Sequence, residues 1–93
     1  MKKSKIIINE YGDKYWILND KLHRIDGPAI EYSNGEKRWH INGKLHRIDG
    51  PAIEYADGTK KWFLNDKEVK EEDVIDINPN ITEKEYINFV INL

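Results

Sequence analysis

A block of twelve residues, KLHRIDGPAIEY, occurs twice without a change, at residues 21–32 and again at residues 44–55. The two copies are 23 residues apart. The same spacing aligns three sets of residues outside the block, namely Gly12, Gly35 and Gly58, Trp16, Trp39 and Trp62, and Asn19, Asn42 and Asn65. A fixed period of this length is typical of repeat proteins, in which each unit buries its apolar face against its neighbours. The sequence therefore predicts two and a half to three stacked units.

Each unit carries two turn signals between short β-rich segments. The words SNGE and ADGT, at residues 33–36 and 56–59, place Asn-Gly or Asp-Gly between strand-like runs, which is a strong hairpin signal. A second turn follows as NDK or NGK, and the Gly-Pro pairs at residues 27–28 and 50–51 predict a wide arc. The expected fold is mainly β, a single-layer antiparallel meander of stacked β-hairpin repeats of period 23, with a C-terminal α-helical cap.

The chain is predicted to form one domain, residues 1–93, with hairpin repeats at residues 5–69 and a cap at residues 70–93. In the cap, Thr82 and Glu85 have the spacing of a helix capping box. Apolar residues follow at helical spacing, namely Tyr86, Phe89, Val90 and Leu93. We expect this face either to close the end of the sheet or to form a homodimer contact.

Alternation along the strands predicts which side chains share a face of the sheet. The face expected to form the core carries aromatic and aliphatic residues from each unit, namely Trp16, Leu18, Ile30, Tyr32, Trp39, Ile41, Ile53, Tyr55, Trp62 and Leu64. The face expected to be mostly solvated carries Tyr15, Ile17, Glu31, Arg38, His40, Glu54, Lys61 and Phe63. The residues predicted to be structural core are Trp16, Trp39, Trp62, Tyr32 and Tyr55.

Charge and composition exclude several classes of function. The net charge is −2, from 15 basic and 17 acidic side chains, so no overall attraction to nucleic acid or to an anionic membrane is expected. The chain has no cysteine, which excludes disulfides and thiolate chemistry. The apolar run Ile6–Ile8 is too short for a signal sequence or a membrane span, and we interpret it as a first strand. A cytoplasmic protein is expected.

One polar word, His-Arg-x-Asp, occurs in both copies of the block. The candidate partner-binding residues are those of this word together with two from the solvated face, namely His23, Arg24, Asp26, His46, Arg47, Asp49, Arg38 and His40. In a functional interpretation, the arginines bind a phosphate or an acidic partner, with the histidines nearby. In a structural interpretation, each aspartate accepts hydrogen bonds that hold the arc. Because a site usually needs one copy, the repetition favours the structural interpretation.

No metal, cofactor or catalytic site is predicted. Equivalent histidines such as His23 and His46 would lie two strands apart, about 9 to 10 Å. Ligands of one zinc ion must each bring a nitrogen to about 2.0–2.1 Å from the metal. Ser4 and Ser33 have no general base at a meaningful spacing, so nucleophilic catalysis is not expected either.

A weak single-stranded nucleic-acid binder is a further alternative. The residues that would form a basic, aromatic platform for stacked bases are Arg38, His40, Lys60, Lys61, Tyr15 and Phe63. Glu31 and Glu54 are predicted to lie on the same face, which disfavours this function.

The segment NGKLHRIDGPAIEYADGTKKW, at residues 42–62, resembles a variant of the MORN repeat. The word NGKLH matches the turn of that repeat, whereas RIDGPA replaces its glycine-rich continuation. The word LHRxDGPA is similar to repeats of small phage and giant-virus proteins, and the resemblance covers residues 7–69. It implies a noncatalytic scaffold that mediates protein contacts and dimerisation, with lipid binding also proposed. We therefore expect a noncatalytic protein-interaction module.

The similarity to phage proteins supports a more specific alternative. The chain would then be a phage-encoded inhibitor, of the anti-defence or anti-CRISPR type, that binds a host nuclease or defence complex in the host cytoplasm.

Overall fold

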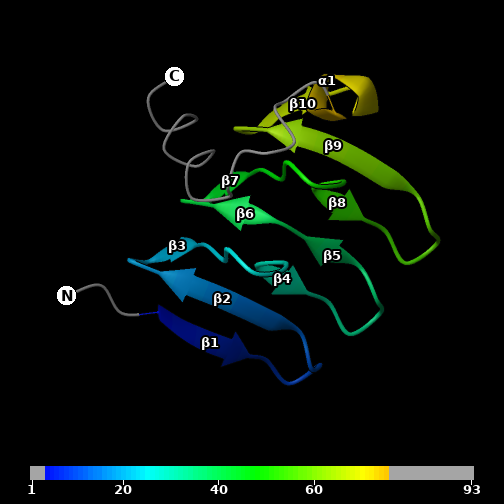
Figure 1. Cartoon of the computed structure of the whole chain (residues 1–93). Helices are drawn as coiled ribbons and strands as arrows, with labels where there is room; N and C mark the ends of the chain where they lie inside the picture. The colour runs from blue at the N-terminus through cyan, green and yellow to red at the C-terminus, as the bar shows by residue number, and fades with distance from the viewer. Residues whose placement is uncertain (1–3, 76–93) are drawn as a thin grey trace.

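The computed structural model describes residues 4–75, which form antiparallel strands followed by one helical turn (Figure 1). The elements in chain order are β1 (Ser4–Ile8), β2 (Lys14–Leu18), β3 (Lys21–Leu22), β4 (Ile30–Glu31), β5 (Lys37–Arg38), β6 (His40–Ile41), β7 (Lys44–Leu45), β8 (Ile53–Glu54), β9 (Lys60–Leu64), β10 (Lys67–Val69) and α1 (Glu71–Ile75). The predicted mainly β fold of stacked hairpins is confirmed.

The predicted C-terminal helix and the absence of a predicted membrane span are considered next to the described residues. The helix predicted from Thr82 onwards, with its homodimer contact, lies outside the described residues. Among residues 4–75, no helix has the length and apolar character needed to cross a membrane.

The first repeat contains one long strand, β2, and one interrupted strand; in the second repeat the counterpart of β2 consists of β5 and β6, separated at Trp39. The main sheet has the order β1-β2-β4-β5-β8-β9-β10, while β3 pairs with β2 and β6 pairs with β7. Both β3 and β4 pair with β2, through Ile17 with Leu22 and through Tyr15 with Ile30. The chain from β3 to β4 is therefore one strand interrupted by residues 23–29, which we call the first arc. The second arc, residues 46–52, interrupts the strand from β7 to β8 in the same way.

Two-residue turns join β2 to β3, β6 to β7 and β9 to β10. Both residues of each turn have positive φ, as at Asn42 (51°) and Gly43 (84°). Such turns match the twist of the strands that they connect, and Asn, Asp and Gly adopt positive φ most easily. The NDK and NGK words therefore form the hairpins that the sequence predicts.

The turns at SNGE and ADGT are one residue longer. The N–H of Tyr32 donates to the carbonyl of Glu36 at 2.9 Å, and within this turn Gly35 has a φ of 99°. This three-residue loop sets Ile30 opposite Arg38. A two-residue Asn-Gly loop would have set Ile30 opposite Trp39. Because side chains alternate along a strand, this shift by one residue exchanges the faces of the sheet.

The predicted face assignment is therefore wrong. Directly paired residues share a face. One side, which we call the Trp face, carries Lys14, Trp16, Ala29, Glu31, Lys37, Trp39, Ala52, Glu54, Lys60 and Trp62. The other side, the Ile face, carries Tyr15, Ile30, Arg38, Ile53 and Lys61. The tryptophans and the central isoleucines thus lie on opposite faces, and the two glutamates lie on the Trp face.

A ladder of alternating charges crosses five strands on the Trp face. Its members, in order of pairing, are Lys14, Glu31, Lys37, Glu54 and Lys60. Opposite charges on directly paired residues contribute roughly 0.2–1 kcal/mol each, whereas like charges would be destabilising. The ladder therefore favours the observed register over a slipped one.

The tightly buried core is small and aliphatic. The buried hydrophobic residues are Ala29, Ile30, Ile41, Ala52 and Ile53, with exposed fractions of 0 to 8%. The tryptophans and the tyrosines that were predicted to form the core, Trp16, Trp39, Trp62, Tyr32 and Tyr55, are half-buried.

His40 was predicted to lie on the solvated face, which is wrong because its exposed fraction is 8%. Its strand, β6, lies in the middle of the stack. Its backbone carbonyl accepts from Arg24 N–H of the preceding unit at 3.1 Å, and His40 pairs with Leu45 on the other side. The backbone of His40 is thus bonded on both sides, which places this residue in the interior of the stack.

We predict that Trp39→Ala destabilises the protein by about 3 kcal/mol and Trp62→Ala by less, about 2 kcal/mol or below. Trp39 packs under an arginine of the second arc, whereas Trp62 pairs with Val69 in a regular ladder. Urea denaturation followed by circular dichroism measures both changes. Equal losses for the two variants would contradict this account of the packing.

Candidate functional site

Each arc leaves the sheet and rejoins it at the same tryptophan. The N–H of His23 donates to the carbonyl of Trp16 at 3.0 Å, and the N–H of Trp16 donates to the carbonyl of Ala29 at 2.8 Å. In the second arc, His46, Trp39 and Ala52 form the same two bonds, at 3.0 and 2.8 Å. The residues between these anchor points therefore project from the sheet.

Arg24 holds the first arc closed. Its Nε donates to Asp26 Oδ1 at 3.0 Å, and its Nη1 donates to the Pro28 carbonyl at 3.1 Å and to Glu31 Oε2 at 3.0 Å. The guanidinium carbon lies 4.0 Å from the centre of the Trp16 ring, which is a close cation–π contact. Only 22% of the arginine side chain remains exposed.

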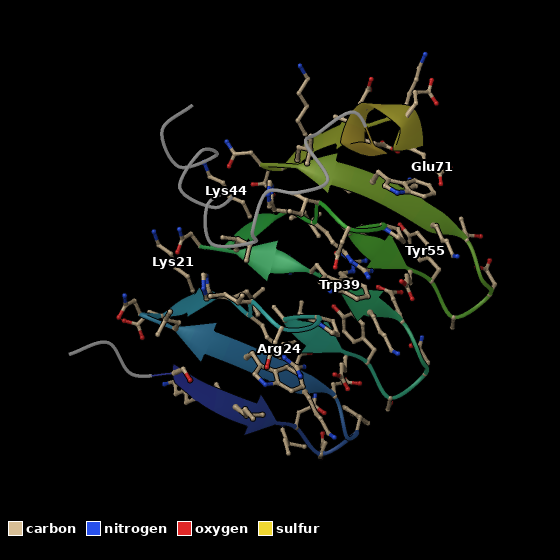
Figure 2. All side chains as sticks on the ribbon, viewed as in Figure 1. Lys21, Arg24, Trp39, Lys44, Tyr55 and Glu71 are labelled. Carbon is tan, nitrogen blue, oxygen red and sulfur yellow. The ribbon has the colours of Figure 1, made fainter. Side chains whose placement is uncertain are left out.

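Arg47 makes the same contacts in the second arc. Its donors reach Asp49 at 2.8 Å, the Pro51 carbonyl at 3.0 Å and Glu54 at 3.1 Å, and its guanidinium lies 3.8 Å from the Trp39 ring centre. The side chains of Arg24 and Trp39 lie in neighbouring repeats near the middle of the stack (Figure 2). The repeated contacts favour the structural interpretation of the polar words.

Two glycines complete these closures. A Cβ atom built on Gly27 would lie 2.8 Å from the Arg24 guanidinium carbon, and one on Gly50 would lie 2.7 Å from that of Arg47. Each guanidinium thus fits between a tryptophan ring and the backbone of a glycine. This explains why Gly occurs at this position of both copies.

The two histidines of the polar words join consecutive units. His23 Nδ1 accepts from the backbone N–H of Asn42 at 2.9 Å, and His46 Nδ1 accepts from that of Asn65 at 2.9 Å. An accepting Nδ1 carries no proton, so each neutral ring has its hydrogen on Nε2. His46 is 4% exposed, and burial lowers its pKa to about 4. We infer that both histidines serve the stacking of the units.

The two remaining candidate residues lie apart from the arcs. Arg38 donates from Nε to Glu36 at 2.7 Å, and its guanidinium lies 5.9 Å from the centre of the Tyr32 ring. Burial, followed by the charge of Arg38, lowers the pKa of His40. A buried neutral histidine cannot form part of a basic platform, which weakens the nucleic-acid alternative. No cluster of three or more His, Cys, Asp or Glu side chains suited to a metal ion occurs within residues 4–75.

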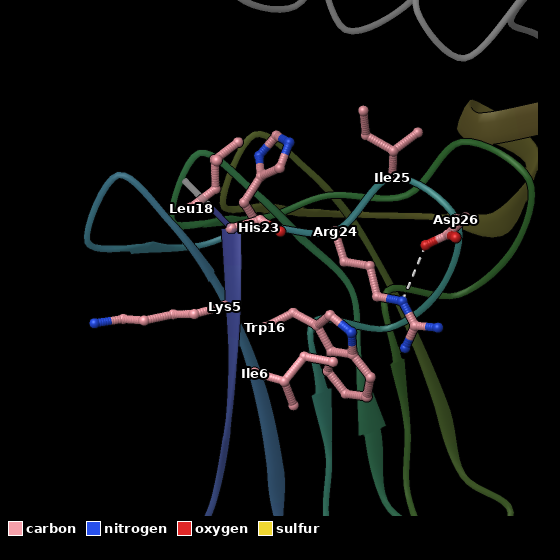
Figure 3. A pocket seen from close by; sticks show the side chains of 9 residues that line it. Lys5, Ile6, Trp16, Leu18, His23, Arg24, Ile25 and Asp26 are labelled. Atoms are coloured by element: carbon pink, nitrogen blue, oxygen red, sulfur yellow. Dashed lines mark hydrogen bonds and ion pairs between the residues drawn. The ribbon is translucent and has the colours of Figure 1, made fainter. Parts of the chain in front are cut away.

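A groove of about 740 Å³ opens on the Trp face where the first arc meets β1 (Figure 3). Its lining residues are Ser4, Lys5, Ile6, Trp16, Leu18, His23, Arg24, Ile25 and Asp26. Ile6 and Trp16 lie side by side below Arg24, whereas the Lys5 side chain points away from the ring (Figure 3). The groove therefore combines an apolar floor with a polar wall.

The strand beside this groove is an exposed edge of the sheet. In β1, the exposed fractions of Ile6, Ile7 and Ile8 are 55, 47 and 59%. This surface was missed at the sequence level, although a signal was present. Three consecutive isoleucines precede the first repeat, so the repeat pattern provides no partner for them.

Comparisons of this chain with protein-family models, with curated proteins and with solved structures give no match.

We predict that Gly50→Ala destabilises the protein by about 1–3 kcal/mol, because the added methyl group displaces the Arg47 guanidinium from Trp39. The change should cost much less in an Arg47→Ala background, where the guanidinium is absent. A double-mutant cycle of urea denaturation measures this coupling. Equal costs in the two backgrounds would show that Gly50 serves another purpose.

We predict that the protein loses stability as the pH falls from about 6.5 to about 4. In that window the unfolded chain takes up a proton at His46, whereas the folded protein does not, so unfolding becomes more favourable. The full loss from this group is on the order of 3 kcal/mol.

His46→Asn is the matched control, because its amide oxygen accepts a hydrogen bond near the position of Nδ1 and does not titrate. Its stability should vary less with pH between 6.5 and 4 in urea titrations. An unchanged pH dependence would exclude His46 as the source. His40, whose pKa is also lowered by burial, contributes in the same window, so the variant should reduce the pH dependence and not abolish it. The pKa values of Asp13 and Asp57 are lowered from 3.8, chiefly by backbone hydrogen bonds from Ser33 and Thr59, so their contribution to the loss of stability falls mainly at lower pH.

Proposed function

We propose that this protein is a noncatalytic interaction module that binds a protein partner at its β1 end, through the groove and the edge strand together. The observation that carries this proposal is the apolar surface exposed there. Three isoleucines, each about half exposed, adjoin a groove whose floor includes Trp16. Exposed apolar surface with polar residues at its border is typical of interaction sites.

The contacts that recur in both arcs support a non-enzymatic role. In both arcs, the Nε and Nη1 donors of the arginine are used by residues of the same arc and of the strand that follows it. Nδ1 of each histidine is likewise used between units. The arginines and histidines of the arcs therefore stabilise the fold. This leaves the exposed apolar surface at β1 as the candidate for binding.

Residues at equivalent positions of the first and second units differ in exposure, and this difference supports a binding site at the β1 end. Ile25 in the first arc is 49% exposed and lines the groove, whereas Ile48, at the same position of the second arc, is half-buried. Leu18 is half-buried, and its counterpart Ile41 is 8% exposed. Apolar residues of the first unit are thus more accessible than the same positions of the second unit.

We predict that a benzophenone amino acid at position 25 cross-links to a protein partner, whereas the same residue at position 48 gives little product. The protein would be incubated with a lysate of the organism that encodes it, irradiated and analysed on denaturing gels. Product that disappears on protease treatment but survives nuclease treatment identifies a protein partner. Mass spectrometry then gives its identity and the cross-linked segment.

Two outcomes would contradict this proposal. Product that is lost on nuclease treatment would favour nucleic-acid binding. Equal labelling from positions 25 and 48 would show that the contact does not depend on the β1 end.

A further inference from the structure

We propose that β1 binds its partner by strand addition, and that the partner contributes an extended segment of alternating apolar and acidic residues. This inference rests on the proposed function and names the kind of segment that the β1 end accepts. It follows from the direction of the backbone groups of β1, from the two sides of this strand and from the charge that it carries.

The backbone of β1 presents hydrogen-bonding groups away from the sheet. Ile6 lies directly opposite Trp16 of β2. However, the N–H and the carbonyl of Trp16 are hydrogen-bonded to the first arc, so they do not bond to Ile6. The N–H of Asn9 donates to the carbonyl of Asp13 at 3.1 Å, which places the odd-numbered residues in the bonds to β2. By the alternation of antiparallel ladders, the N–H and carbonyl groups of Ser4, Ile6 and Ile8 point outward.

Of the features that usually prevent strand addition, this edge carries one charged side chain and no proline or bulge. Monomeric proteins protect edge strands with proline, with bulges or with charged side chains. In β1, all five residues pair regularly with β2, and Lys5 is the one charged residue among Ser4–Ile8. The last three positions are isoleucines that are about half exposed. An extended segment can therefore pair along the whole strand.

The two sides of β1 require different residues from an added strand. Ile6 and Ile8 point to the Trp face, where the groove extends over Trp16. Lys5 and Ile7 point to the opposite side, and Figure 3 shows the Lys5 side chain directed away from Trp16. Side chains of an added strand alternate in the same way. Apolar residues are expected on the groove side, with an acidic residue facing Lys5 between them.

Charge favours an acidic segment more broadly. Of the two cations that line the groove, Arg24 is already paired with Asp26 and Glu31, so Lys5 is the positive charge that an added strand would meet. Complementary charge guides association and selects among partners. A segment rich in lysine would meet like charges at this edge.

A second copy of this chain fits the surface less well. Two β1 strands paired edge to edge would bury side chains from one five-residue strand of each copy, which is small beside the roughly 1,000 Å² that a specific interface needs. A separate segment can pair with β1 and place a side chain in the groove.

The test uses three blocked seven-residue peptides and the full-length protein labelled with ¹⁵N. The first peptide alternates valine and glutamate, the second alternates valine and lysine, and the third repeats the first with N-methylated valines that cannot donate hydrogen bonds. We expect the first peptide to shift the amide signals of β1 and the indole signal of Trp16. We expect it to bind about tenfold more tightly than the second, and the third not to bind.

Variants of the protein test the two contributions separately. Lys5→Glu should reverse the preference between the glutamate and lysine peptides. Lys44→Glu, an equal charge change at an exposed position of β7 in the second unit, should leave the order of the two peptides unchanged. Ile6→Pro removes an outward N–H that the added strand needs, so it should abolish binding. The fold should survive, because proline is tolerated on an edge strand whose N–H faces solvent. Ile6→Val keeps the N–H and should bind nearly as the original protein does.

Several results would overturn the proposal. Equal binding of all three peptides, or shifts that avoid β1, would exclude strand addition. Sedimentation that shows a dimer of the peptide-free protein, dissociated by Ile6→Pro, would assign the edge to a second copy instead. If the cross-linker at position 25 captures a protein and the peptides do not bind, strand addition is wrong while the interaction module stands. If both experiments fail, the proposed function fails with it.

Discussion

The stacking of one arginine on one tryptophan holds each arc in place, and the rest of the architecture follows from it. The guanidinium of Arg24 lies between the Trp16 ring and the backbone at Gly27, and its N–H groups hold Asp26, the Pro28 carbonyl and Glu31. Without these contacts, the arc would expose the tryptophan and leave a polar loop without fixed partners. With them, one strand can leave the sheet and rejoin it opposite the same residue.

The same interaction explains why two copies of the block are identical. Almost every residue type in His-Arg-x-Asp-Gly-Pro-Ala has a defined partner in both arcs. The histidine accepts from the next unit, the arginine closes the arc, the glycine leaves room for the guanidinium and the alanine is fully buried below it. A substitution at one of these positions would affect several contacts at once. Repetition of the word is therefore a structural requirement of each arc.

The sequence predicted the local elements well and the pairing between them less well. The period, the hairpins and the two-residue turns follow from Asn, Asp and Gly at fixed positions, and all are present. The faces were assigned wrongly because SNGE forms a three-residue loop, so that Ile30 stands opposite Arg38. A difference of one residue in a turn changes which side chains share a face, and both loop lengths are compatible with the same letters. The sequence also favoured a structural interpretation of Arg24 and Arg47, but it did not predict that each stacks on a tryptophan.

The candidate site depends on position in the stack rather than on the residues of the repeat, which is why sequence patterns did not reveal it. Trp16 and Trp39 occupy the same place in identical contacts with an arginine, yet the groove forms beside Trp16, where β1 replaces a preceding unit. At the other end, Trp62 pairs with Val69 in a regular ladder, since no arc follows it. An internal unit has its strand edges paired on both sides, whereas the first unit ends at an open strand. In stacked repeats of this kind, the middle units pair with one another, so the surface that we propose for recognition lies where the repetition stops.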